Sequence, residues 1–266
     1  MSGPQRQAQP QAQANHRMPA LSVNVNKIAL LRNARHGQVP SVVGLARVAL
    51  NAGAHGITVH PRPDERHIRR HDVDDCAALL AETDYAGAEF NIEGNPLLPH
   101  LMPILRDIRP TQATLVPDDP NQNTSDHGFD LTNPQTVAEL APIVAELKEL
   151  GCRVSVFIDP DPAVAAAAPA LGCERVELYT ERYAQAHGTV HGPRTLERFV
   201  ETARAAQTAG LGVNAGHDLN LDNLPTFAAA VPNLLEVSIG HALVADALER
   251  GMTDAVQAYL AALGRP

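Results

Sequence analysis

The chain has 266 residues, a formal net charge of −9 and 44% hydrophobic residues. The acidic balance argues against a nucleic-acid-binding surface, which needs clustered Lys and Arg, and no apolar run approaches the roughly 18 residues of a membrane span. This length and this apolar content allow one large domain or two small ones.

The first segment of the chain differs from the rest. Residues 1–20 are rich in Gln, Pro and Ala and lack the apolar core of a signal peptide, so we expect a disordered tail followed by a single domain over 21–266. The three cysteines, Cys76, Cys152 and Cys173, are odd in number and show no Cys-x-x-Cys spacing. We therefore expect buried free thiols, which fits a reducing, cytoplasmic environment.

Short apolar runs alternate with helical patterns through the first half of the chain. The predicted strands cover residues 21–26, 56–60, 89–94 and 111–117. The predicted helices cover 42–51, after the N-cap residue Ser41, and 72–83, and a further helix begins at Pro96. The polar stretch 118–132 has no periodicity, and a loop of this length is typical of a lid or a binding loop.

The same alternation continues through the second half. The predicted strands cover residues 153–159, 175–180, 211–217 and 235–241. The predicted helices cover residues 134–150, 161–172, 193–209, 222–230, 242–249 and 253–263. Strands that alternate with helices indicate parallel βαβ units.

Eight such units in a chain of this length predict a (β/α)8 TIM barrel. The main competitor is a doubly wound sheet, but no Gly-x-Gly-x-x-Gly follows the first strand. In a barrel the carboxyl ends of all strands meet on one face, where the active site forms. The residues expected at this rim are Asn24, Asn26, His60, Glu93, Pro117, Asp159, Glu177, His217, Gly240 and His241.

Three ionisable residues at this rim suit general acid–base chemistry. His60 and His217 can donate or accept a proton near neutral pH. Glu93 lies in an otherwise apolar strand, where partial desolvation would raise its pKa toward that of a useful general base. The alternative is that Glu93 pairs with an arginine and merely closes the top of the barrel.

The rim also contains candidate anion-binding sites. Gly216-His217-Asp218 and Gly240-His241 follow the seventh and eighth strands, where barrels often bind phosphate through backbone N–H groups and helix N-termini. Arg35, Arg62 and Arg66 are candidates to clamp a second phosphate. Taken singly, each Gly-His pair is equally compatible with a plain turn, and each arginine with a solvated surface residue.

Three other interpretations use the same residues. His60, Glu93, His217 and His241 could bind zinc or manganese in a sugar-phosphate epimerase or aldolase, although no His-x-His or His-Glu-x-x-His motif supports this. Lys27, one of only two lysines, could form a Schiff base. The third interpretation is a barrel that binds a ligand without catalysis. It would not explain why ionisable residues from several separate strands meet at one rim.

Several motifs together resemble the pyridoxine 5′-phosphate synthase family, and the resemblance covers residues 21–263. The motifs are L-S-V-N-V-N, L-R-N-A-R, G-I-T-V-H-P-R-P-D-E-R-H-I, F-N-I-E-G, S-V-F-I-D-P-D-P, V-N-A-G-H-D-L and S-I-G-H-A-L. The resemblance implies a TIM barrel that condenses 1-deoxy-D-xylulose 5-phosphate with 3-amino-2-oxopropyl phosphate. The products would be pyridoxine 5′-phosphate, phosphate and water. It implies no metal and no organic cofactor, and it implies assembly as a homo-octamer.

The resemblance also implies a role for each matching residue. His60 and Glu93 would accept protons and His217 would donate one. The amino-ketone phosphate would be held by Asn24, Asp218, Gly240 and His241. The deoxyxylulose phosphate would be held by Arg35, Arg62, His67 and Thr124, with Glu177 as an auxiliary polar group inside the barrel.

The sequence departs from the usual family pattern in two places. Asn26-Lys27 replaces the usual Asp-His after the first strand, at a position expected to contact the deoxyxylulose phosphate. The acidic stretch 118–121, Asp-Asp-Pro-Asn, replaces a basic Glu-Lys-Arg-Gln stretch in the expected lid. We expect the loss of cations there to weaken closure over the phosphate, and Lys27 to restore part of the charge.

Overall fold

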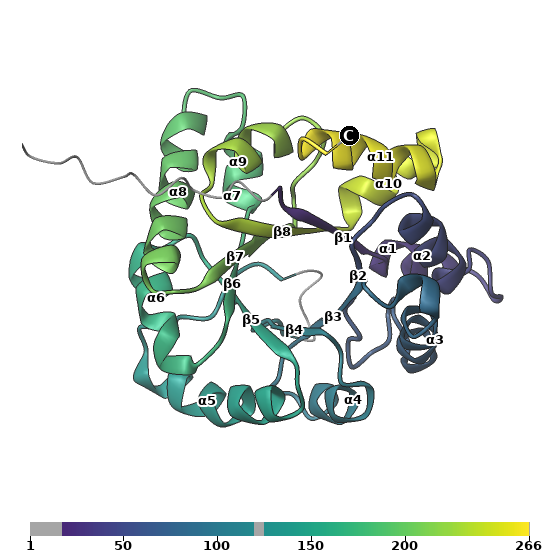
Figure 1. Cartoon of the computed structure of the whole chain (residues 1–266), viewed down its shortest axis with the longest axis horizontal. Coiled ribbons are helices and arrows are strands. Elements are labelled where there is room, and N and C mark those ends of the chain that lie inside the picture. The colour runs from purple at the N-terminus through teal and green to yellow at the C-terminus, as the bar shows by residue number, and fades with distance from the viewer. Residues whose placement is uncertain (1–17, 120–124, 266) are drawn as a thin grey trace, which may run out of the picture.

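In the computed structural model, which describes residues 18–119 and 125–265, eight parallel strands form a closed barrel in the order β1 to β8 (Figure 1). The strands are β1 (Ala20–Asn24), β2 (Gly56–Val59), β3 (Glu89–Gly94), β4 (Gln112–Leu115), β5 (Arg153–Ile158), β6 (Arg175–Leu178), β7 (Gly212–Ala215) and β8 (Leu234–Ile239). Parallel pairing of β1 with β8, in which Val23 lies opposite Ile239, closes the ring. The predicted TIM barrel is confirmed.

Helices surround the barrel on its outside (Figure 1). They are α1 (Asn26–Asn33), α2 (Val42–Asn51), α3 (Arg70–Leu80), α4 (Leu101–Ile108), α5 (Pro134–Glu149), α6 (Pro162–Ala167), α7 (Glu181–Ala186), α8 (Gly192–Thr208), α9 (Leu224–Ala230), α10 (His241–Arg250) and α11 (Met252–Ala262). Two 3-10 turns, η1 (Thr83–Tyr85) and η2 (Ala168–Leu171), complete the set. None of the helices described is long and apolar enough to cross a membrane.

Capping residues account for the helices whose starts agree with the prediction. The Ser41 side chain accepts a hydrogen bond from the backbone N–H of Gly44, and α2 begins at the next residue. Asn133 and Asp161 cap α5 and α6 in the same way, and each is followed by a proline in the first turn. These local signals are strong because they satisfy N–H groups that the helix itself leaves unpaired.

Three parts of the secondary structure differ from the prediction. Strand β1 ends at Asn24, because its side chain accepts a hydrogen bond from the N–H of Asn26, and α1 begins there in place of a longer strand. Helix α4 begins at Leu101 and not at Pro96, because the Asn95 side chain accepts from the N–H of Leu97 and holds a turn. The short helix α7 follows β6 where only a loop was expected.

The strands bury apolar residues outward against the helices and polar residues inward. Leu21, Val23, Ile57 and Val59 belong to the main hydrophobic cluster, whereas Thr58, between the last two, lies 2.7 Å from the Ser22 hydroxyl inside the barrel. Asn91 and Thr114 continue this inner layer with a 3.0 Å hydrogen bond. Because side chains alternate along a strand, one face of each strand builds the core and the other lines a polar interior.

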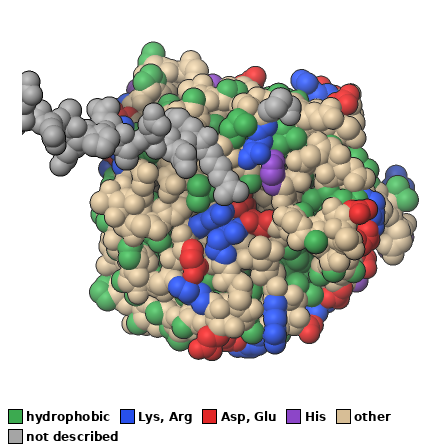
Figure 2. Space-filling model, viewed as in Figure 1, with side chains coloured by type: hydrophobic (Ala, Val, Ile, Leu, Met, Phe, Trp, Pro, Cys, Tyr) green, Lys and Arg blue, Asp and Glu red, His purple; other side chains and the backbone are tan. Residues whose placement is uncertain are grey.

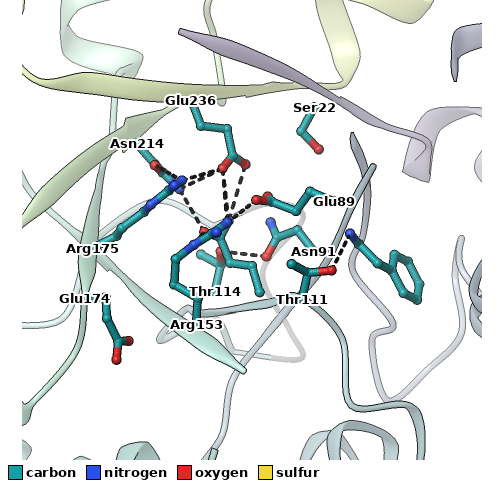
Figure 3. A network of polar contacts seen from close by, with 12 residues as sticks. Ser22, Glu89, Asn91, Thr111, Thr114, Arg153, Glu174, Arg175, Asn214 and Glu236 are labelled. Atoms are coloured by element: carbon teal, nitrogen blue, oxygen red, sulfur yellow. Dashed lines mark hydrogen bonds and ion pairs between the residues drawn. The ribbon is translucent and has the colours of Figure 1, made fainter. Parts of the chain in front are cut away.

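An ion network fills the amino end of this interior (Figure 3). Arg175 donates to Glu236 at 2.7 Å and to Asn214 at 3.0 Å, and Arg153 donates to Glu89. Basic and acidic side chains adjoin near the centre of the same face in the space-filling view (Figure 2). The paired charges stabilise strands β3, β5, β6 and β8 against one another at the end opposite the carboxyl rim.

A second buried ion pair holds the loop between β2 and α3. The guanidinium of Arg32 donates to both carboxylate oxygens of Asp72, and both side chains are only 3% exposed. Arg32 and Asn33 also donate to the backbone carbonyl of His67, at 3.3 and 2.8 Å. The pair therefore joins α1 to α3 and fixes the backbone of a residue predicted to bind substrate.

We predict that Asp72→Asn lowers the free energy of unfolding by about 3–5 kcal/mol, because it leaves the buried Arg32 guanidinium without its counter-charge. Urea unfolding followed by circular dichroism measures this loss. The matched control is Glu82→Gln, which breaks the exposed Arg47–Glu82 pair and should cost no more than about 1 kcal/mol. Equal losses in the two variants would contradict the importance assigned to the buried pair.

Candidate active site

A cavity of about 250 Å³ opens at the carboxyl end of the barrel. The residues that line it are Asn24, Asn26, Lys27, His60, Arg62, His67, Glu93, Val116, Ser125, Phe157, Glu177, His217, Asp218, Ser238, Gly240 and His241. They come from all eight strands or from the segments directly after them, with β4 represented by Val116 and Ser125, which follow it. The barrel thus gathers residues that are almost 220 positions apart in the sequence.

His60 and Glu93 face each other across this cavity. His60 directly follows β2, and its Nδ1 lies 3.9 Å from Oε2 of Glu93 on β3. This distance is too long for a direct hydrogen bond, so an atom of a bound molecule on the cavity side can bridge the two groups by hydrogen bonds. In the part of the chain that the structure describes, Glu93 has no ion pair with an arginine, so the pairing that the alternative requires is not found there.

Glu93 is a neutral acid at neutral pH. Burial raises its pKa to about 8, and the negative charge of Asp118 acts in the same direction, while the hydrogen bond from Asn24 Nδ2 at 3.3 Å opposes them. Deeper in the barrel, burial and the charges of Glu93 and Glu89 also raise the pKa of Glu177. A carboxyl group whose pKa lies close to the working pH can both give and take a proton.

Asn24 and Asn26 connect three strands at the rim. Asn24 reaches Glu93 on β3, as described above, and its own Oδ1 accepts from the N–H of Asn26. The Asn26 side-chain carbonyl accepts from the backbone N–H of His60 at 2.9 Å. Asn26 therefore positions the backbone of His60, which is a task that its amide performs without any charge.

His67 is a neutral hydrogen-bond donor beside the cationic side of the cavity. Its pKa is lowered to about 3, mainly by burial and in addition by the neighbouring groups His60, Arg62 and Lys27. Its Nδ1 accepts a hydrogen bond from the N–H of Ile68 at 2.9 Å, so the proton of the neutral ring is on Nε2. His67, Arg62 and Lys27 together offer donors and positive charge from the segments after β1 and β2.

His217 lies across the cavity, after β7. Its Nδ1 is 2.7 Å from Oδ2 of Asp218, and its ring contacts Tyr179 edge-on at 5.5 Å between centroids. The backbone before it is tightly packed, because a Cβ on Gly216 would lie 2.0 Å from the carbonyl oxygen of Ser238. A glycine is thus required there for His217 to reach the rim.

The end of β8 leads directly into the N-terminus of α10. Gly240 is the N-cap residue and His241 is the first residue of this ten-residue helix, and both line the cavity. A Cβ on Gly240 would lie 3.1 Å from the Asn24 side chain. Gly240 therefore packs closely against Asn24 and brings the N-terminus of α10 to the cavity. The free backbone N–H groups at a helix N-terminus favour binding of a negative charge.

Four residues predicted at the site or its rim do not line the cavity, namely Arg35, Arg66, Pro117 and Asp159. Arg35 lies in the exposed loop after α1, in a separate hollow beside Arg69. Thr124 lies outside the described residues, although the next residue, Ser125, lines the cavity. All other predicted site residues line it.

Sequence reasoning missed Val116, Ser125, Phe157 and Ser238 as lining residues. Three of them carry a signal that could have identified them, because each lies two positions after an inward polar residue of its strand, as Phe157 does after Ser155. Val116 and Phe157 join Tyr179 in a small apolar cluster apart from the main core. They form an apolar wall opposite the cationic side.

Asp118 corrects the prediction for the acidic stretch. It was expected in the lid over the cavity, but it is only 4% exposed. Its carboxylate lies 3.3 Å from Nε2 of His60 and 3.0 Å from the guanidinium of Arg62. Within the described residues, no group of three or more His, Cys, Asp or Glu side chains is arranged to hold a metal ion.

The chain resembles one family along almost its whole length. The family model for pyridoxal phosphate biosynthesis protein PdxJ matches residues 21–265. A protein from Xanthomonas campestris pv. campestris (strain B100), named pyridoxine 5′-phosphate synthase, is 55% identical over 247 residues, which cover 91% of this chain and 94% of that protein. A protein of the same name from Albidiferax ferrireducens is 56% identical over 245 residues, covering 90% and 95%.

Solved structures with low sequence identity share the fold. The 3-keto-L-gulonate-6-phosphate decarboxylase from Vibrio cholerae superposes with a TM-score of 0.62 at 12% identity, covering 93% of this chain and 98% of that one. Tryptophan synthase from Mycobacterium tuberculosis gives 0.61 at 15% identity, covering 94% of each chain. These similarities support the barrel and carry no information on the reaction.

We predict that the stability of the protein falls as the pH rises from about 5 to about 9, partly because Glu93 must ionise. Its pKa in the folded chain is raised to about 8, so its contribution is complete below the ordinary carboxyl pKa and is lost as the pH rises through 8. Glu93→Gln should reduce this loss by an amount on the order of a few kcal/mol. Thermal unfolding of both proteins across this range measures the difference, and parallel pH profiles would contradict the assignment.

Proposed function

The chain belongs to the pyridoxal phosphate biosynthesis protein PdxJ family, and from this premise we propose that it is a pyridoxine 5′-phosphate synthase, an enzyme that closes the ring in vitamin B6 biosynthesis. The substrates proposed are 1-deoxy-D-xylulose 5-phosphate and 3-amino-2-oxopropyl phosphate, and the products are pyridoxine 5′-phosphate, phosphate and water. The observation that carries the proposal is the neutral Glu93 carboxyl facing His60 across a cavity with groups suited to anions at two places on its rim.

The two anion-binding regions fit two phosphorylated substrates. Lys27, Arg62 and His67 supply donors after β1 and β2, and the N-terminus of α10 supplies Gly240 and His241 after β8. We assign the deoxyxylulose phosphate to the first region and the amino-ketone phosphate to the second. Near the second region, Asn24 offers an amide, and Asp218 offers a carboxylate that attracts the substrate's ammonium group.

The acid–base groups suit the chemistry of this condensation. Imine formation, enolisation and elimination of water and phosphate each move protons to or from substrate oxygen, nitrogen or carbon. We assign His60 and Glu93 as the proton acceptors and His217, on the opposite side, as the proton donor. Glu93 accepts in its ionised form, which a pKa of about 8 leaves accessible near neutral pH. Glu177 lies below them as a neutral polar group.

Arg35, Thr124, the homo-octamer and the cytoplasmic location also belong to the proposal. Leu30 and Leu31 on α1 and Leu248 on α10 are exposed, and contact between copies of the chain would cover such apolar side chains. All three cysteines are free and buried, which supports a reducing compartment.

We expect the purified protein, mixed with both substrates, to form pyridoxine 5′-phosphate with or without a chelator, as detected by mass spectrometry. Glu93→Gln should lower turnover by at least about 100-fold, because it removes a positioned acid–base group. Glu149→Gln, at the exposed end of α5, is the matched control and should retain activity. Loss of activity in chelator, or an isomerised sugar phosphate in place of the product, would instead favour the metal-dependent epimerase or aldolase.

Lys27→Met should raise the KM for deoxyxylulose phosphate by about 10- to 100-fold with a smaller change in kcat, because a charge-assisted contact to phosphate contributes about 1.5–3 kcal/mol. The chain's other lysine supplies the control. Lys148→Met breaks an exposed pair with Glu174 on the outside of the barrel and should leave both constants unchanged. An unaltered KM in the Lys27 variant would remove Lys27 from the phosphate site.

A further inference from the structure

A buried carboxylate, Asp118, lies behind the proposed catalytic histidine. It follows β4 and is 4% exposed. Its Oδ2 is 3.3 Å from Nε2 of His60 and 3.0 Å from a guanidinium nitrogen of Arg62. Its backbone carbonyl accepts a hydrogen bond from Asn95 Nδ2 at 3.0 Å. Asp118 is therefore held by the segments after β2 and β3 as well as by its own strand.

Asp118 remains an anion in this environment. Burial acts to raise its pKa, but the hydrogen bond from His60 and the positive charge of Arg62 outweigh burial, and the pKa is lower than that of an ordinary aspartate. An ionised carboxylate only accepts hydrogen bonds. The nitrogen of His60 that faces Asp118 must therefore carry a proton.

This assignment determines what the other side of the His60 ring can do. With the proton on Nε2, a neutral imidazole presents the lone pair of Nδ1, and Nδ1 is the atom that faces Glu93 at 3.9 Å. The His60 ring therefore lies between the Asp118 carboxylate on its Nε2 side and the neutral Glu93 carboxyl on its Nδ1 side. The other titratable or charged groups near the ring are Arg62, His67 and His100.

We propose that Asp118 is a positioning residue that orients His60 and holds its proton on Nε2, so that Nδ1 is ready to accept a proton from the substrate. This proposal rests on the proposed function. The same carboxylate fixes the guanidinium of Arg62, and it thereby couples the acid–base side chain to the proposed phosphate-binding side chain. Such indirect partners commonly set the tautomer and orientation of a functional histidine.

A purely structural role for Asp118 explains its surroundings less well than the proposed positioning role does. The second oxygen of Asp118, Oδ1, is buried and has no hydrogen-bond partner in the described part of the chain. A buried acceptor without a partner is costly, and an amide or an apolar residue would avoid part of that cost. The charge at this position is therefore better explained by what it does to His60 and Arg62.

The kinetic test compares Asp118→Asn with Asp118→Glu. We expect Asp118→Asn to lower kcat by about 10- to 100-fold, as for other partners of functional histidines, with secondary structure retained by circular dichroism. Asp118→Glu keeps the charge and should recover part of kcat. Asp84→Asn, an exposed change in η1, should behave as wild type. Wild-type kcat in Asp118→Asn, or equal losses in the Asn and Glu variants, would overturn the proposal.

The spectroscopic test reads the tautomer directly and does not require turnover. Histidine-labelled protein is studied by solid-state ¹⁵N NMR at about pH 7.5, where imidazoles of ordinary pKa are mostly neutral and Glu93 is still mostly protonated. His60→Asn identifies the His60 signals. We expect the Nε2–H form in wild type and a shift toward Nδ1–H in Asp118→Asn. An Nδ1–H form in wild type would overturn the proposal even if either variant failed to fold. A wild-type protein that shows the Nε2–H form but makes no pyridoxine 5′-phosphate would contradict only the proposed function.

Discussion

The site depends on one geometric constraint, the closure of eight parallel strands by the pairing of β1 with β8. Because every strand runs in the same direction, every carboxyl end reaches the same rim. His60, Glu93 and His217 come from three strands of that ring, and Gly240 is packed against Asn24 where the ring closes. If the closing pair separated, the helix N-terminus after β8 would lose its place beside the other groups.

The polar interior of the barrel gives these groups their chemistry. Residues that face inward are shielded from water, and this shielding disfavours charge on the carboxyl groups of Glu93 and Glu177. Asp118 is also buried, but it forms an ion pair with Arg62, and this pair keeps the Asp118 carboxylate ionised. His60 thus lies between a neutral acid and an anion, and this asymmetry gives each ring nitrogen a different task.

The sequence predicts the parts of the structure that depend on local signals or on the alternation of elements. Eight alternating units indicated the barrel, and Ser41 indicated the start of α2, because caps and periodicity act within a few residues. Asp118 was misjudged because its burial depends on Arg62 and His60, which are nearly 60 residues earlier in the chain. Arg35 was placed at the site both as a candidate phosphate clamp and by family resemblance, but the loop after α1 holds it in a separate hollow. Such tertiary placements leave no trace in local patterning.

Glu93 faces His60 as a neutral acid at neutral pH, and infrared difference spectroscopy of wild type against Glu93→Gln detects that state. The difference isolates Glu93 from the other buried carboxyl groups, Asp72, Asp118, Glu177 and Glu236. We predict a protonated carboxyl band that is present at pH 7 and disappears as the pH rises through about 8. A difference spectrum at pH 7 that contains only an ionised carboxylate would contradict it.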